Sequence, residues 1–150
     1  MRNFAVGMGR ILAIDYGTKR TGIAVSDPLR IIAGGLDTIP TSQVMDWLKK
    51  YTAGNDVSII VLGKPLQMDA SPSDTYEKVL ELSGRIEKGF PGIKVVLFDE
   101  RFTSVLAHRA MIDGGMKKMQ RRDKSVVDKI SATIILQGYM ESKEYKDLQR

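Results

Sequence analysis

Short apolar runs alternate with amphipathic stretches along the chain, a pattern that predicts an α/β domain. Residues 11–15 and 21–25 are apolar runs rich in Ile and Val, and the polar sequence YGTKR separates them. Two such runs around a short polar turn predict an antiparallel hairpin. The sequence RIIAGGLDTI at 30–39 predicts a third extended segment. Together these segments predict an antiparallel meander at the start of the domain.

Strands and helices alternate over the rest of the chain. The sequence VSIIVLG at 57–63 is continuously apolar, which is typical of a strand covered on both faces, and IKVVLFDER at 93–101 predicts another buried strand. Apolar residues spaced three and four apart predict helices over 43–53, 76–86, 103–115 and 125–140. The order βββ-α-β-α-β-α-α predicts a five-stranded mixed sheet, in which right-handed crossovers follow the meander.

A single domain accounts for all 150 residues, because no repeat, linker or low-complexity tract interrupts the pattern. Residues 1–8 hold one short apolar patch and are expected to form a flexible extension, with the native start at either Met1 or Met8. Residues 142–150 are expected to form a flexible tail. The sequence shows no signal peptide and no run of about 18 apolar residues that could span a membrane. We therefore expect a cytoplasmic protein.

Composition limits the chemistry that the chain can use. There is no cysteine and one histidine, His108, which excludes disulfides, thiolate nucleophiles and imidazole-rich metal sites. A bound metal would have to sit on oxygen ligands, as Mg²⁺ or Mn²⁺ does. The 23 Lys and Arg residues exceed the 18 Asp and Glu residues, and the formal charge of +5 favours a polyanionic partner. Charge alone does not establish nucleic-acid binding, since many basic proteins of this size bind none.

Carboxylates stand at two strand ends and at the start of the closing helix. Asp15 ends the first predicted strand, Asp99 and Glu100 end the last, and Asp128 lies in the first turn of the closing helix. If the first and last strands both lie near the middle of the sheet, these acids meet at one edge, where α/β sheets bind ligands. Taken singly, Asp15 also suits a turn, Asp99 and Glu100 an ion pair with Arg101, and Asp128 a helix cap.

Acids gathered in this way would need a positive partner. Carboxylates about 4 Å apart repel by roughly 4 kcal/mol per pair at an effective dielectric constant near 20. A divalent cation would offset that repulsion. Two ions about 3.5–4 Å apart could activate a water and stabilise the leaving oxygen of a phosphodiester.

Cations near these acids suggest phosphate contacts. Gly17 permits a tight turn in GTKR, where Thr18 and Lys19 could contact a phosphate, although an ordinary hairpin turn with solvated cations fits equally well. The sequence MKKMQRRDK, just before Asp128, carries five cations and one acid and forms either a basic flap over the site or a solvated loop. The candidate phosphate-binding residues are Thr18, Lys19, Arg20, Lys64, Arg101, Lys117, Lys118, Arg121 and Arg122.

Four motifs in order resemble the YqgF family, also called RuvX, whose members are named pre-16S rRNA nucleases or Holliday junction resolvases. The motifs are IDYGTKRTGIAVSD, GKPLQMDAS, DERFTS and VDKISATIILQGYM, and the resemblance extends from about Gly9 to Tyr139. It departs mildly from the family pattern at Lys64, Gln67 and Ala70, in the loop that follows the fourth strand. The departures concern substrate handling by that loop rather than the acids.

The resemblance implies an RNase H-like fold, shared with RuvC-type resolvases, and a metal-dependent nuclease site. It assigns catalysis and metal binding to Asp15, Glu100 and Asp128, with Asp99 as a further acid. The implied cofactor is Mg²⁺ or Mn²⁺, with two ions present when substrate is bound. The implied substrate is structured RNA, and the implied reaction is processing of the 5′ end of pre-16S rRNA in ribosome biogenesis.

Three alternatives stay open at this point. The same chemistry could act on four-way DNA junctions in recombination and repair. The chain could be a nucleic-acid-binding ribosome-assembly factor with little turnover. It could also be a phosphotransferase, because DYGTKRTG is similar to the first phosphate loop of sugar kinases and actin-like ATPases, but those folds need two such domains. The sequence allows either a monomer or a homodimer.

Overall fold

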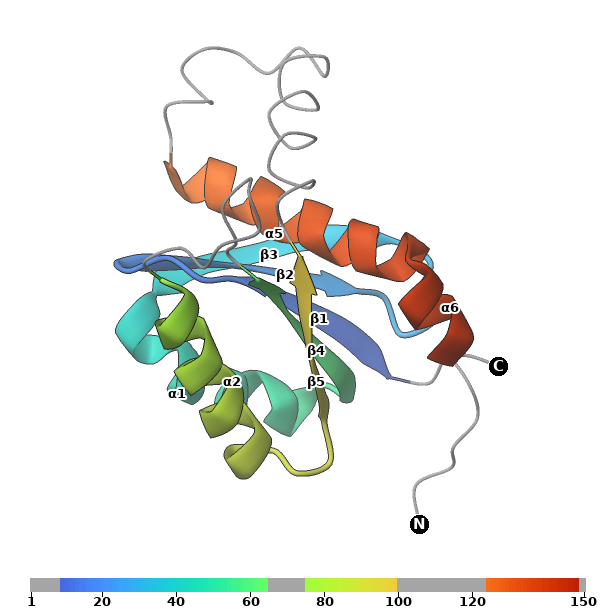
Figure 1. The fold of residues 1–150 in the computed structure, drawn as a ribbon, viewed down its shortest axis with the longest axis horizontal. Coiled ribbons are helices and arrows are strands. Elements are labelled where there is room, and N and C mark those ends of the chain that lie inside the picture. The colour runs from blue at the N-terminus through green and yellow to red at the C-terminus, as the bar shows by residue number, and fades with distance from the viewer. Residues whose placement is uncertain (1–8, 65–74, 100–123, 149–150) are drawn as a thin grey trace.

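A five-stranded sheet with helices on both faces makes up the described part of the chain, residues 9–64, 75–99 and 124–148 of a computed structural model (Figure 1). The strands are β1 (Arg10–Asp15), β2 (Arg20–Ser26), β3 (Ala33–Pro40), β4 (Val57–Lys64) and β5 (Lys94–Asp99). The helices are α1 (Val44–Gly54), α2 (Tyr76–Gly89), α5 (Lys124–Glu141) and α6 (Lys143–Leu148), and a 3₁₀ turn, η1 (Thr41–Gln43), precedes α1.

The strand order is β3-β2-β1-β4-β5. The β1–β2 and β2–β3 pairs are antiparallel, whereas the β1–β4 and β4–β5 pairs are parallel. This arrangement confirms the expected mixed sheet and is an RNase H-like fold. β1 is central, as expected, but β5 is an outer strand of the described sheet and not a middle one. The continuously apolar β4 takes the inner position between them, since it is the strand buried on both faces.

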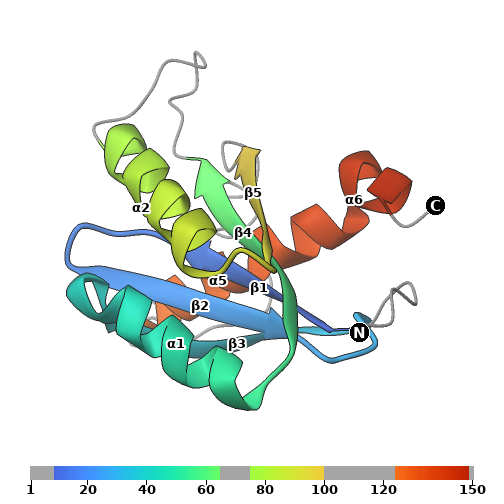
Figure 2. The same ribbon diagram turned by 90° about the horizontal axis from the view of Figure 1, so that it is seen from below.

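Alternation along the strands divides the core into two layers. Leu12 and Ile14 of β1 pack in one cluster with residues of α1 and α2, whereas Ile11 and Ala13 pack in the other with residues of α5. Figure 2 shows α1 and α2 on one face of the sheet and α5 on the other. A strand residue therefore faces either α1 and α2 or α5, according to its place in the alternation.

The β2–β3 connection is longer than the sequence pattern predicts, because the third strand begins at Ala33 and not at residue 30. The Asp27 carboxylate accepts hydrogen bonds from the backbone N–H groups of Leu29 at 3.1 Å, and of Ile31 and Ile32 at 2.7 Å each. These bonds, that of Ile32 foremost, hold the pKa of Asp27 below its ordinary value, although partial desolvation opposes them. The amides of this segment thus bind a side chain instead of a neighbouring strand.

One further difference concerns the end of the chain. Residues 143–148, for which a flexible tail is expected, form α6, and Tyr145 lies against Tyr139 with ring centroids 5.3 Å apart. The expected helix at 103–115 lies outside the described residues. Among the helices of the described ranges, none is long and apolar enough to cross a membrane.

Candidate active site at the end of strand β1

Asp15 lies on the face of the sheet that α5 covers. Its two chain neighbours, Ile14 and Tyr16, both pack with the α1 and α2 cluster. Side chains alternate along a strand, so Asp15 between them faces the opposite side. The carboxylate is partly buried, at the C-terminal end of the central strand. This end of a strand is where α/β sheets place ligand-binding groups.

Glycines occupy the strand positions on both sides of Asp15. Gly22 of β2 is its antiparallel partner. On the other side Ile14 pairs with Leu62 of β4, so that the next residue, Gly63, lies alongside Asp15. Neither neighbour has a side chain, so no residue of the adjacent strands projects beside the carboxylate, although both glycines are themselves buried. Since adjacent strands lie about 4.8 Å apart, roughly 10 Å separates β1 from β5 across the bare position of Gly63.

Asp99 and Lys64 belong to the other face. Val95 and Leu97 of β5 pack with the α1 and α2 cluster, and the alternation continues to Asp99 on that side. Lys64 of β4 pairs with Asp99 in the parallel register. Strand geometry thus places these two residues on the face opposite to that of Asp15. Glu100, the next residue in the chain, lies outside the described residues.

Helix α5 brings the third acidic position over the face that holds Asp15. Asp128 is the fifth residue of α5, one residue further into the helix than the sequence predicts; its side chain is outside the described part. Lys129 and Thr133 come close to β3 at Gly35, where an added Cβ would lie 3.2 Å from Lys129 Cβ and 3.3 Å from Thr133 Oγ1. In Figures 1 and 2, α5 begins on the same side of the molecule as the β1–β2 hairpin.

The turn after Asp15 exposes the predicted phosphate-binding side chains of Thr18, Lys19 and Arg20. Gly17 is required here, because an added Cβ would collide with the backbone carbonyl oxygen of Arg20. Its φ angle is not positive, so the reason for glycine is this close approach and not a left-handed conformation. The remaining predicted cations, Arg101, Lys117, Lys118, Arg121 and Arg122, lie outside the described residues.

The chemistry of the donors suits a hard divalent cation. Asp15 offers carboxylate oxygen, which Mg²⁺ and Mn²⁺ prefer. Among the side chains that the structure describes, no group of three acids or histidines is close enough to hold a metal. Two of the three predicted ligands, Glu100 and Asp128, are not among those side chains, so the complete set stays a prediction.

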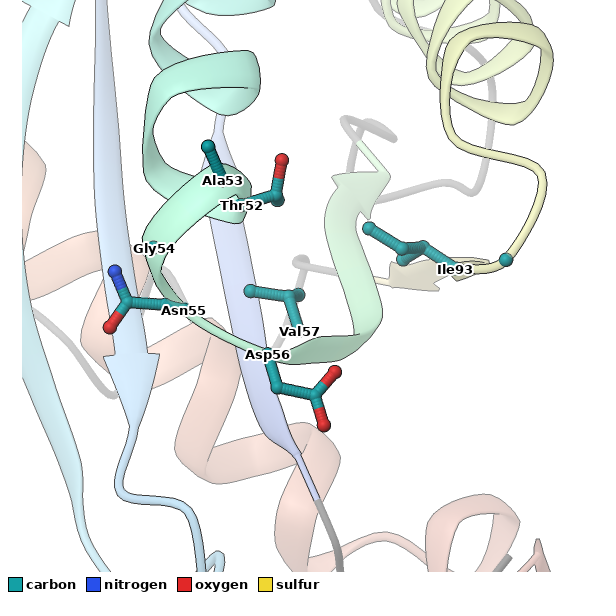
Figure 3. A pocket seen from close by; sticks show the side chains of 8 residues that line it. Thr52, Ala53, Gly54, Asn55, Asp56, Val57 and Ile93 are labelled. Atoms are coloured by element: carbon teal, nitrogen blue, oxygen red, sulfur yellow. The ribbon is translucent and has the colours of Figure 1, made fainter. Parts of the chain in front are cut away.

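A depression of about 430 Å³ lies at the opposite end of the sheet (Figure 3). It is lined by the α1–β4 connection and by Gly92 and Ile93 before β5. Figure 3 shows the side chains of Asn55 and Asp56 pointing in different directions. Because it lies at the N-terminal ends of the parallel strands and brings no polar groups together, we do not assign chemistry to it.

Sequence reasoning missed one residue next to the site, Thr41. Its hydroxyl donates a hydrogen bond of 2.6 Å to the backbone carbonyl oxygen of Gly17, 24 residues earlier in the chain. A contact over this separation has no local signal in the sequence.

Comparison with known proteins agrees with this arrangement. Residues 9–142 match the family described as RuvX: Holliday junction resolvase. A protein of Phocaeicola vulgatus named "Putative pre-16S rRNA nuclease" is 54% identical over 92% of this chain and 99% of its own length. Proteins of the same name from Parabacteroides distasonis and Bacteroides thetaiotaomicron are each 50% identical, over 93% and 92% of this chain and 99% and 100% of their own.

Similarity to solved structures is weaker. YeaZ from Pseudomonas aeruginosa is 18% identical, with a TM-score of 0.44 over 72% of this chain and 50% of that chain, which is too low to bear on function. The match to the family and the relatives, by contrast, extends over nearly the whole chain and includes β1, its following turn and α5. This chain belongs to the RuvX family.

Proposed function

We propose that this protein is a metal-dependent endonuclease that hydrolyses phosphodiester bonds in structured RNA, with the 5′ end of pre-16S rRNA as its substrate. The observation that carries the proposal is Asp15, a carboxylate at the end of the central strand with glycine on both neighbouring strands. The names of the relatives supply the reaction and the RNA. Neither source addresses the metal, which rests on the hard oxygen ligands alone.

Asp15, Glu100 and Asp128 would hold the divalent ions. When bound, the ions supply activation of the attacking water and neutralisation of charge on the scissile phosphate. Because Gly22 and Gly63 have no side chains, neither neighbouring strand projects a group beside Asp15, where the ions and the scissile phosphate would bind. Asp99 of β5 lies on the opposite face of the sheet from Asp15, so we give it no role as a metal ligand.

The turn at 16–20 would hold phosphates of the substrate. Thr18, Lys19 and Arg20 are exposed directly after Asp15. A guanidinium, an ammonium and a hydroxyl all donate hydrogen bonds to phosphate oxygens. The first two also place positive charge at the edge of the sheet where the acids lie. Each cation neutralises a phosphate next to the one being cleaved. The basic residues at 117–122 would extend this contact.

The test is cleavage of a 5′-labelled pre-16S rRNA fragment with and without Mn²⁺ or Mg²⁺. Asp15→Asn should lower the cleavage rate by roughly 100-fold or more, because one ligand charge is lost, while the folded structure is retained. Asp46→Asn, an exposed acid in the first turn of α1, is the matched control and should cleave normally. Undiminished cleavage by Asp15→Asn, or cleavage that needs no divalent ion, would refute the assignment.

A second candidate substrate is the four-way DNA junction, which the description of the matching family favours. Resolution of a junction requires paired cuts, and therefore two sites related by a two-fold axis. A synthetic junction in the same assay, with sedimentation of the protein, separates the two. Symmetric cuts by a dimer would support the junction, and RNA cleavage by a monomer would reject it. RNA binding without any cleavage would instead indicate an assembly factor.

A further inference from the structure

Thr41 joins the turn after Asp15 to the end of β3 through hydrogen bonds to residues far apart in the sequence. Its hydroxyl donates to the carbonyl oxygen of Gly17 at 2.6 Å, and its backbone N–H donates to the carbonyl oxygen of Lys19 at 3.0 Å. Its Oγ1 also lies 2.8 Å from Oγ1 of Thr21, whose side chain is fully buried. One residue thus contacts the turn at two places and strand β2 at a third.

The direction of each bond follows from counting protons. A threonine hydroxyl has one proton to donate and lone pairs that accept. Thr41 donates its proton to the Gly17 carbonyl, so in the contact between the two hydroxyls Thr21 is the donor and Thr41 the acceptor. The result is a chain from Thr21 through Thr41 to Gly17. Bonds in such a chain polarise one another, which strengthens the last of them.

This chain sets the orientation of the peptide that follows Gly17. The peptide is trans, since the described residues contain no cis bond. In a trans peptide the C=O and N–H groups point in opposite directions. Turning the Gly17 carbonyl toward Thr41 therefore turns the N–H of Thr18 away from it. The carbonyl of Lys19 is turned toward Thr41 as well. Two acceptors that would repel an anion are thus directed toward Thr41.

We propose that Thr41 is a positioning residue for phosphate binding. By holding the carbonyls of Gly17 and Lys19, it presents the N–H and hydroxyl of Thr18 and the ammonium of Lys19 as an anion-binding group next to Asp15. The ligand class is a phosphate of the nucleic-acid backbone. This inference rests on the proposed nuclease function and adds to it a residue outside the acids and cations of the site.

The experiment measures binding of a labelled pre-16S rRNA fragment by fluorescence anisotropy in EDTA, so that neither metal nor cleavage contributes. Thr41→Val keeps the shape and removes the hydroxyl, and should raise Kd about fivefold to tenfold, the scale of one hydrogen bond. Thr41→Ser keeps the hydroxyl and should bind as wild type does. The salt dependence should also weaken in Thr41→Val by about one phosphate contact, as it should in Lys19→Ala.

A merely structural role for Thr41 is separated by two further variants. Thr21→Val removes the buried hydroxyl but leaves Thr41 bonded to Gly17, so it should lower stability and raise Kd far less than Thr41→Val does. Thr41→Val should raise Kd by a smaller factor in a Lys19→Ala background than in wild type, because Thr41 and Lys19 act through the same phosphate contact. Should Thr41→Val unfold, because it leaves the Thr21 proton without an acceptor, the Thr21→Val, Thr41→Val double variant removes that cost.

The outcomes are distinct. Unchanged Kd in a folded Thr41→Val protein, or full additivity with Lys19→Ala, overturns the positioning role and leaves the nuclease proposal intact. If the wild-type protein binds RNA but never cleaves it, and the variants change Kd as predicted, the positioning role is supported and the nuclease proposal is overturned. A wild-type protein that binds no RNA overturns both.

Discussion

Replacing Tyr139 with Phe should keep or raise stability at neutral pH and should remove a loss of stability at alkaline pH. Tyr139 of α5 is 0% exposed, and among the described residues its hydroxyl has no hydrogen-bond partner. Burial raises the pKa of Tyr139 to about 12, with further increases from Glu144 and Tyr145 and an opposing effect of Arg30. The phenol is thus held neutral in the folded protein.

The magnitude follows from the shift. One pKa unit corresponds to about 1.36 kcal/mol, so a rise from 10.0 to about 12 corresponds to roughly 2–3 kcal/mol. Solvent near Glu144 and Arg30 screens part of this, which leaves roughly 1–2 kcal/mol. Because the pKa of Tyr139 is raised in the folded protein, the stability contributed by its neutral phenol is fully present below the unfolded pKa of about 10. That contribution is lost as the pH rises from there through about 12. At neutral pH, Phe avoids burying a hydroxyl without a partner, for a gain of up to about 1 kcal/mol.

The assay is urea unfolding of wild type and Tyr139→Phe at about pH 8, 10 and 11.5, with phenolate absorbance recorded in parallel. Lysines deprotonate in both proteins over this range, so the difference between the two isolates Tyr139. Tyr76→Phe, at a partly exposed ring on α2, is the control and should behave as wild type does. Equal losses of stability in wild type and Tyr139→Phe, or ionisation of Tyr139 near pH 10, would refute the reasoning.

Two further predictions concern the loop at 27–32 and the seat of α5. Asp27→Ala should speed amide hydrogen exchange at Ile31 and Ile32, because their N–H groups lose an acceptor. In wild type the exchange rate should approach that of the variant only below about pH 4, where acid protonates Asp27, because the pKa of Asp27 is lowered. Unchanged exchange in the variant would contradict this. Gly35→Val should lower the free energy of unfolding by about 1–3 kcal/mol and should slow cleavage by displacing α5. Gly34→Val should do neither, because no atom of the described residues lies within 4 Å of its Cβ position. Equal effects of the two valines would refute the packing argument.

The strand and helix pattern was predictable because burial imposes a period on the sequence. Apolar runs identified β1, β2, β4 and β5, and the three-and-four spacing identified α1, α2 and α5. The pattern failed at 30–32, where apolar residues do not enter the sheet. There the carboxylate of Asp27 competes with a neighbouring strand for the backbone N–H groups, and a single acid gives no periodic signal.

The candidate site was likewise only partly predictable from the sequence. Asp15 at the end of an apolar strand was visible in the sequence, because a carboxylate after four apolar residues stands out against the burial pattern. Which acids share its face was not visible. That depends on strand order and on the alternation of side chains in paired strands, which place Asp99 and Lys64 opposite Asp15.

Residue types and their local spacing were enough to indicate the family and most of the described strands and helices, since these depend on composition and on neighbours within a few positions. Long-range pairing supplied the rest. Gly22 and Gly63 matter because they lie on either side of Asp15, and Thr41 matters because β3 ends beside a turn 24 residues earlier. The stretch IDYGTKRTG thus contains an acid and nearby cations, while strand pairing decides which residues flank the acid, and Thr41 binds the turn that follows it.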